Sequence, residues 1–174
     1  MRVVVSALAA ALSLALSSAP AGAVERQLQL SLRPGFSWSS GAFGGPGAAV
    51  DLGATYGLND AFSVYANAAW SVALPEAVRN SPRHGASLSA GVFYAFDYLR
   101  VVPYGGLGLR GDLFVAPDEG WITFSPEARF GATWLVRRSF AVDLQGAYAF
   151  PLFARDRAGD LFTVTAGAML LFDL

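Results

Sequence analysis

Seven ionisable residues lie in segments that are otherwise apolar or built from small residues, and they are the first candidates for chemistry. An arginine beside a carboxylate can serve as a gate that exchanges partners, or it can neutralise a charge removed from water. A buried charge must be paired or lose its charge, so the spacing of these residues matters. The seven are Arg33, Asp51, Arg110, Glu127, Arg129, Asp143 and Asp173.

The spacing predicts that several of these charges meet if their segments are neighbouring strands. Glu127 and Arg129 are two residues apart and therefore share one face of a strand. A symmetric loop between the first two strands places Arg33 opposite Asp51. These positions favour pairing between charges over isolated ionic groups.

A symmetric loop at 112–121 brings in a further strand. In that register Gly106 lies beside Glu127 and Tyr104 beside Arg129, and glycine leaves room for the long side chains. We predict a structural ion-pair network inside the fold, and the alternative is a narrow gated channel whose ion pairs exchange partners. The predicted network consists of Arg33, Asp51, Arg110, Glu127, Arg129 and Asp143.

The residues from 122 to 150 show most clearly which elements position these charges. Phe124, Phe130 and Trp134 share one parity with other apolar residues, whereas polar and small residues hold the other parity. Alternation with a period of two is typical of a strand with one apolar and one polar face. This stretch is therefore predicted to be a strand, a tight turn at 137–139 and a second strand.

The same alternation recurs along the chain and predicts eight strands with no helix. Short turns at 59–60, 97–100 and 137–139 alternate with loops of eight or more residues, as in an up-and-down barrel. The long loops are expected at 39–46, 73–84, 112–121 and 151–160. The strands are expected at 27–38, 47–58, 62–72, 85–96, 101–111, 122–136, 140–150 and 161–174.

The apolar face of these strands carries no Asp, Glu, Arg or Lys, and its aromatic residues gather near strand ends. Two aromatic girdles around an aliphatic band are typical of a barrel that spans a bilayer. The girdle near the long loops contains Trp38, Trp70, Phe124, Tyr148 and Phe150. The girdle near the short turns contains Tyr56, Tyr94, Trp134, Phe140 and Phe172.

Composition supports the same class and excludes others. Apolar residues make up 54% of the chain and charged residues only 14%, whereas an average soluble domain is about a quarter charged. No basic cluster exists, so nucleic acid is not an expected partner. The chain has no cysteine, which rules out disulfides and thiolate metal sites. We expect no cofactor, no metal site and no catalytic residue.

The first 23 residues are predicted to be a cleaved signal peptide. Met1 and Arg2 precede an apolar run at 3–16, and Ala23 ends a small-residue cleavage site. The run is shorter than the ~20 residues that a membrane-spanning helix needs. The mature part, 24–174, is then a single domain. Within it Pro34 and Pro126 fall inside expected strands, and we expect a bulge at each or shorter strands.

The mature chain resembles the small eight-stranded outer-membrane barrels of the OmpA transmembrane domain and OmpX type. The shared features are the leader, the short turn at Asn59 and Asp60, the Pro-Tyr-Gly-Gly start of the strand at 101–111, and the alternating last strand. The last strand ends with leucine and has Phe172 two residues before it, whereas the family usually ends on an aromatic residue. The resemblance covers architecture and is specific to no single member.

The resemblance implies a bacterial outer-membrane location, with short turns in the periplasm and long loops outside the cell. It implies outer-membrane lipid and lipopolysaccharide as surroundings, and the assembly machinery as a partner during biogenesis. A monomer is expected. The loops at 73–84, 112–121 and 151–160 carry charges that could contact lipopolysaccharide or a host surface, which leaves surface recognition as another role.

The same resemblance gives a lipid A-modifying enzyme as a further alternative, because the related PagL-like lipid A deacylases use a serine, a histidine and an acidic residue on the outer surface. In that group the histidine stands two residues before the serine. The one histidine here, His84, ends an expected loop, and Ser87 follows three residues later with its side chain expected inward. This spacing disfavours nucleophilic catalysis.

Overall fold

The computed structural model describes residues 26–41, 45–73, 83–96, 101–115, 120–153 and 159–173. The predicted signal peptide, the last residue and most of the expected loop charges lie outside these ranges. Eight strands form one closed barrel in chain order. They are β1 (Gln27–Ser39), β2 (Gly45–Gly57), β3 (Phe62–Ala73), β4 (Arg83–Ala95), β5 (Val101–Val115), β6 (Gly120–Arg137), β7 (Phe140–Ala149) and β8 (Leu161–Asp173).

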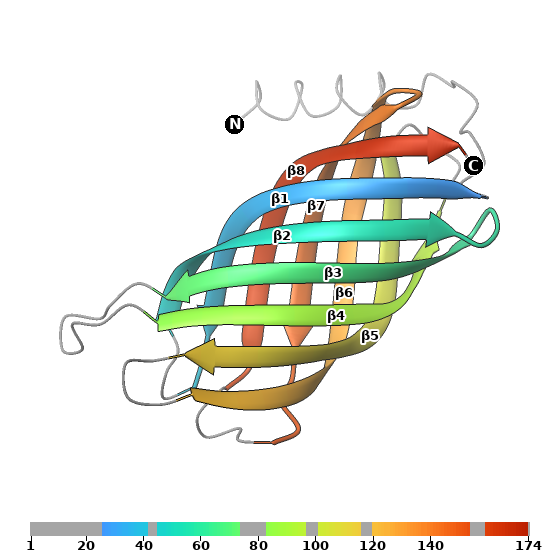
Figure 1. Cartoon of the computed structure of the whole chain (residues 1–174). Coiled ribbons are helices and arrows are strands. Elements are labelled where there is room, and N and C mark those ends of the chain that lie inside the picture. Colours follow the sequence, from blue (N-terminus) through green and yellow to red (C-terminus); the bar gives the residue numbers. More distant parts are fainter. Residues whose placement is uncertain are drawn as a thin grey trace, which may run out of the picture.

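Every strand pairs antiparallel with its neighbours in the chain, and β8 returns to pair with β1 (Figure 1). This topology confirms the predicted all-β, up-and-down, eight-stranded barrel. A closed sheet has no free edge, so the backbone hydrogen bonds are made within it. Within the described part of the chain, no helix has the length and apolar content to cross a bilayer.

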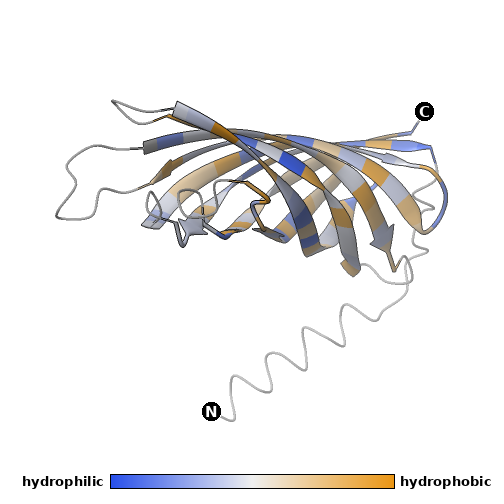
Figure 2. Ribbon diagram, turned by 90° about the horizontal axis from the view of Figure 1, so that it is seen from below, coloured by the Kyte–Doolittle hydropathy of each residue, from blue (hydrophilic) through white to orange (hydrophobic). Residues whose placement is uncertain are grey.

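The two faces of the sheet differ as the alternation predicts, and Figure 2 shows hydrophobic and hydrophilic residues following one another along the strands. On the outer face Leu88, Leu107 and Leu109 are exposed by 70%, 73% and 70%. On the inner face Glu127 and Asp143 are exposed by 2% and 0%. The barrel interior, which we call the lumen, therefore holds the charged side chains, and the large apolar side chains cover its outside.

Two of the expected long loops are shorter than predicted. β2 already begins at Gly45, and β5 and β6 continue to Val115 and from Gly120, so the loops predicted at 39–46 and 112–121 are wrong in extent. Glycine and aspartate in these segments suggested loops by composition. The ladders continue through them because the inward parity is kept; Asp112 is one of the buried inward residues.

The expected bulges at the two prolines are also wrong. Pro34 lies within β1 and aligns with Val50 of β2, and the pairing with β8 resumes beyond it in unchanged register. At Pro126 the carbonyl oxygen accepts a hydrogen bond from the amide of Phe150 at 3.1 Å. The nitrogen of Pro126 faces the same neighbouring segment as its carbonyl oxygen, so the ladder keeps the bond from Phe150 and lacks only the one that an N–H at 126 would donate.

Close backbone contact marks the seam between β1 and β8. A Cβ atom added at Gly167 would collide with the main-chain oxygen of Leu32 and the Cα atom of Arg33. Backbone atoms cannot rotate aside, so only glycine allows the strands to approach this closely. Gly167 therefore allows β1 and β8 to approach closely because it has no side chain.

Replacing Gly167 with alanine is expected to lower the free energy of unfolding by about 1–3 kcal/mol, as overpacking does in a close-packed site. Urea unfolding of the refolded barrel in detergent micelles, followed by tryptophan fluorescence, measures this loss. Gly105→Ala is the matched control, because its Cβ would lie 3.9 Å from the nearest atom, the Arg129 oxygen. Equal stability of the two variants would contradict the steric explanation.

Candidate functional site

The six residues predicted to form the ion-pair network all lie in the lumen, and Asp112 joins them. Six inter-residue ion pairs link these side chains, whose exposed fractions do not exceed 7%. Their strands are β1 for Arg33, β2 for Asp51, β5 for Arg110 and Asp112, β6 for Glu127 and Arg129, and β7 for Asp143.

The first part of the network joins β7, β1 and β2. Arg33 donates from Nη1 to Asp143 Oδ2 at 2.8 Å. It also donates from Nε and Nη2 to Asp51 Oδ1 at 3.2 and 2.5 Å. Nη2 makes a further bond of 3.0 Å to Asn67 Oδ1. One guanidinium therefore connects two carboxylates on different strands.

The central part is built around Arg129. Its Nη1 donates to Asp51 Oδ2 at 3.3 Å and to Gln145 Oε1 at 2.7 Å. Its Nη2 donates to Ser89 Oγ at 2.9 Å, and Nε and Nη2 both donate to Glu127. The guanidinium also lies 5.3 Å from the ring centre of Tyr65. Arg129 thus has the role of a central connector.

The last part leads toward the long-loop end of β5. Arg110 Nη1 lies 3.4 Å from Glu127 Oε2, and its Nε donates to Asp112 Oδ1 at 2.7 Å. The ion pairs therefore form one continuous series of alternating sign, which we call the charge chain. Its order is Asp143, Arg33, Asp51, Arg129, Glu127, Arg110 and Asp112.

The register between β5 and β6 corrects one expectation. Gly106 lies opposite Arg129 and Gly108 opposite Glu127, whereas Tyr104 faces Gly131. The shift is two residues from the symmetric prediction, because both strands extend further and the turn is centred later in the chain. Glycine still provides room, since a Cβ at Gly108 would collide with the hydroxyl of Tyr65.

Several members of the network were not among the predicted site residues. Tyr104 donates to both oxygens of Asp143 at 3.1 Å, and Thr133 donates to Oδ1 at 3.0 Å. Tyr65 donates to Glu127 Oε1 at 3.3 Å. All three have the inward parity, so polar character at inward positions was the available signal.

Asp112 and Asp173 show how strand ends affect such predictions. Asp112 was expected in a loop and is instead inside the barrel with 4% exposure. Asp173 was expected inward, yet it is exposed at the end of β8, where it accepts a hydrogen bond from Gln27 Nε2 at 3.2 Å. A carboxylate on the last residue of a strand can turn into solvent, whereas one within the ladder cannot.

Apolar and aromatic side chains fill the lumen near the short-turn end. Phe93 stacks on Tyr65 at a centroid distance of 4.2 Å and contacts Tyr104 at 4.8 Å. Met169 and Leu171 form a further buried cluster with Ala141, and Leu135 packs against it. The lumen is thus packed by an apolar cluster at one end and crossed by the charge chain along its middle.

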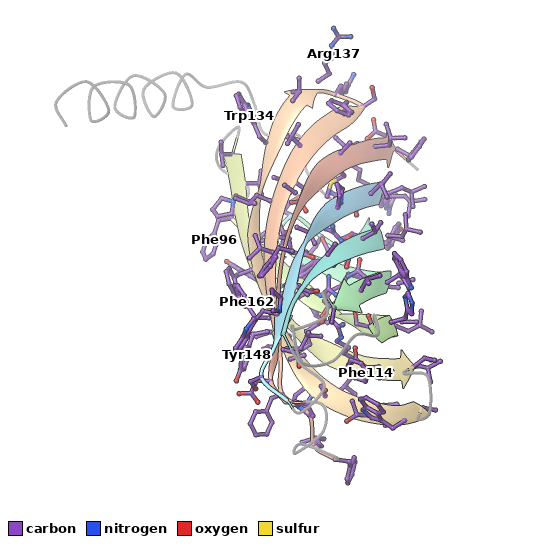
Figure 3. All side chains as sticks on the ribbon, turned by 90° about the vertical axis from the view of Figure 1, so that its left-hand side faces the viewer. Phe96, Phe114, Trp134, Arg137, Tyr148 and Phe162 are labelled. Atoms are coloured by element: carbon purple, nitrogen blue, oxygen red, sulfur yellow. The ribbon has the colours of Figure 1, made fainter. Side chains whose placement is uncertain are left out.

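The ten predicted girdle residues lie on the outer face. In Figure 3 Trp134 lies toward one end of the barrel, and Tyr148 and Phe162 toward the other. Phe150, Tyr56 and Phe140 are half-buried by their neighbours. The other seven are exposed by 41–59%: Trp38, Trp70, Phe124, Tyr148, Tyr94, Trp134 and Phe172.

His84 lies within β4 and not in a loop, which corrects the sequence-based placement. Its exposed ring stacks on Trp70 at 5.7 Å with an interplanar angle of 19°. Ala86 lies two residues after His84 on the same face, where the deacylases have their serine. Ser87 is a buried inward residue. The histidine–serine arrangement of the deacylases is therefore missing at this position. Among the residues that the structure describes, no group of acidic or histidine side chains could hold a metal ion by itself.

Comparison with known proteins finds no matching family model and no matching curated sequence. Solved structures do match. Ail, the attachment invasion locus protein of Yersinia pestis, is 19% identical, with 85% of this chain and 99% of that chain covered and a TM-score of 0.61. Neisserial surface protein A is 16% identical, with 83% and 97% covered and a TM-score of 0.67.

A third match is the outer-membrane protein OprG from Pseudomonas aeruginosa. It is 11% identical, with 90% of this chain and all of that chain covered, at a TM-score of 0.64. Identities this low establish shared architecture, and the matches extend over almost the full length of each barrel. The chain has the fold of the small eight-stranded transmembrane barrels of the bacterial outer membrane.

Proposed function

We propose that this chain is an integral outer-membrane protein with a structural or surface-interaction role and no wide pore. The observation that carries the proposal is the reversal of polarity between the two faces of the barrel. Leucines exposed by 70% or more cover the outside, while the guanidinium and carboxylate groups of the charge chain are inside. In water this distribution would be strongly unfavourable, and in a bilayer it is the stable one.

The expected surroundings follow from this placement. The aromatic girdles would lie at the two membrane interfaces, with the aliphatic band between them in the hydrocarbon layer. Lipopolysaccharide and phospholipid would be its lipid contacts, the short turns would face the periplasm, and the assembly machinery would insert it as a monomer. Beyond the long-loop end of β7, Leu152 and Phe153 are exposed by 57% and 66% and are available to a surface partner.

The filling of the lumen supports a barrel without a wide pore. Arg33 and Arg129 reach across the interior to carboxylates on other strands. The stacked rings of Tyr65 and Phe93 and the apolar cluster with Met169 occupy the short-turn end. Eight strands leave an interior only wide enough for side chains to fill.

A narrow gated conduit is the second candidate, and the position of Glu127 favours considering it. Its carboxylate is shared by two arginines, with Arg129 close and Arg110 at 3.4 Å. A small rotation of the Glu127 side chain could exchange these partners and alter the path for ions along the lumen. The two candidates differ in one measurable property, which is steady ionic conductance.

The mature protein, refolded in detergent, is expected to migrate differently in a gel before and after boiling, because a closed barrel resists denaturation until heated. In a planar lipid bilayer it is expected to insert without steady conductance steps. Identical migration of both samples would contradict a stable membrane barrel. Steady conductance steps would favour the narrow conduit over the closed lumen and would leave the membrane assignment unchanged.

A further inference from the structure

The charge chain carries an excess of one negative charge among the lumen side chains that the structure describes. It contains three guanidinium groups, from Arg33, Arg110 and Arg129, and four carboxylates. All seven side chains are almost entirely buried. An uncompensated carboxylate in such a place is costly, so a further positive charge nearby would stabilise it.

Hydrogen bonding shows where the excess is located. Asp143 and Asp51 each accept bonds at both carboxylate oxygens. Glu127 likewise accepts from Arg129 and Tyr65 at Oε1 and from both arginines at Oε2. Among the described side chains, the bond that Asp112 accepts is at Oδ1, from Nε of Arg110. The terminal carboxylate of the charge chain is therefore the least compensated.

Residues with hydroxyl groups flank Asp112 on the neighbouring strands. The register places Ser87 of β4 and Thr123 of β6 directly opposite Asp112, on its two sides. Ser125, opposite Arg110, is 1% exposed, and its Oγ is a buried polar atom without a hydrogen-bond partner in the described part of the chain. Thr123 donates its proton to the main-chain oxygen of Phe153 at 2.8 Å, so its lone pairs remain available.

Oxygen atoms of this kind are the ligands of hard metal cations. We propose that the long-loop end of the lumen binds one monovalent metal cation, Na⁺ or K⁺, through the carboxylate of Asp112 and the hydroxyl oxygens of Ser125, Thr123 and Ser87. One positive charge balances the charge chain. A divalent ion would reverse the excess, and it usually requires more carboxylate ligands than the single one found here.

The test compares thermal unfolding of the refolded barrel in zwitterionic micelles with NaCl, KCl or choline chloride at equal ionic strength. Choline is too large for the proposed site, and its quaternary nitrogen cannot bind oxygen ligands as a metal ion does. The wild type is expected to melt roughly 2–4 °C higher in Na⁺ or K⁺ than in choline, with saturation as the cation concentration rises. Asp112→Asn is expected to remove this difference, because three guanidinium groups then balance three carboxylates.

Asp60→Asn is the matched control, since it removes the same charge from an exposed turn at the other end of the barrel. It should keep the cation dependence of the wild type. Ser125→Ala should retain the effect at a higher half-saturating concentration. For the wild type alone, ²³Na relaxation should show bound sodium that K⁺ displaces, which tests the site even if a variant fails to fold.

Two outcomes would overturn the proposal. One is an unchanged cation dependence in Asp112→Asn, which would place the ion elsewhere. The other is equal melting of the wild type in all three salts together with the absence of bound ²³Na, in which case a proton neutralises the excess carboxylate. Neither result depends on the conductance of the barrel, so the proposed function is tested separately.

Discussion

Replacing Arg129 with alanine is expected to lower the free energy of unfolding by about 3–5 kcal/mol, the range found when one partner of a buried ion pair is removed. Arg129 is the central connector of the charge chain, with ion pairs to Asp51 and Glu127 and further bonds to Gln145 and Ser89. Its removal leaves two buried carboxylates short of positive charge and leaves polar groups unpaired.

Urea unfolding in phosphatidylcholine vesicles, followed by tryptophan fluorescence, measures this loss. The control is Arg138→Ala, which removes the same side chain from an exposed turn and should change stability by no more than about 0.5 kcal/mol. The double variant Arg129→Met with Glu127→Gln should lose less than the sum of the single changes, because the charges then leave together. A cost for Arg129→Ala as small as that of the control would show that the charge chain is not a stabilising unit.

Replacing Leu107 with arginine is expected to destabilise the bilayer-inserted barrel by about 2–4 kcal/mol, the cost of a charge near the middle of the membrane. Leu107 lies near the middle of β5 and is exposed by 73%. Its neighbours across the ladder are Val92 and Ala128, so no carboxylate is in position to pair with the new charge. In a water-facing barrel the same change would cost almost nothing.

Leu113→Arg is the depth control for this prediction. Leu113 lies on the same outer face of β5, six residues closer to the long-loop end, and its side chain is exposed by 44%. A charge near the interface is expected to cost about 0–1 kcal/mol. Equal effects of the two substitutions in vesicles would argue against a membrane-embedded band centred on Leu107.

The alternation of side chains was sufficient to predict the barrel and the face on which charges lie. The assumption of a symmetric loop between the first two strands also placed Arg33 opposite Asp51 correctly. The pairing of β5 with β6 was predicted two residues away from its actual register, since a shift of two preserves the face of every side chain. Periodicity therefore predicts orientation well and distance along the strand poorly.

Contacts across the lumen could not be predicted from the sequence, for a related reason. Arg33 meets Asp143 and Arg129 meets Asp51, and these pairs lie on strands that are not neighbours in the sheet. Such contacts depend on the tilt and stagger of the closed barrel, which no local pattern encodes. Asp112 was missed because its glycine-flanked segment resembles a loop, although it continues a ladder on both sides.

The order of the charge chain has a consequence for how the protein is made. Its members come from β1, β2, β5, β6 and β7, and the pair Arg33–Asp143 joins residues far apart in the sequence. The β1–β2 and β5–β6 hairpins can form four of the six ion pairs by themselves, whereas Arg33–Asp143 and Arg129–Asp51 join strands that meet only across the lumen. The two cross-lumen pairs add their stabilisation only when the barrel closes, so Asp143 gains its arginine at closure, and such long-range contacts slow folding.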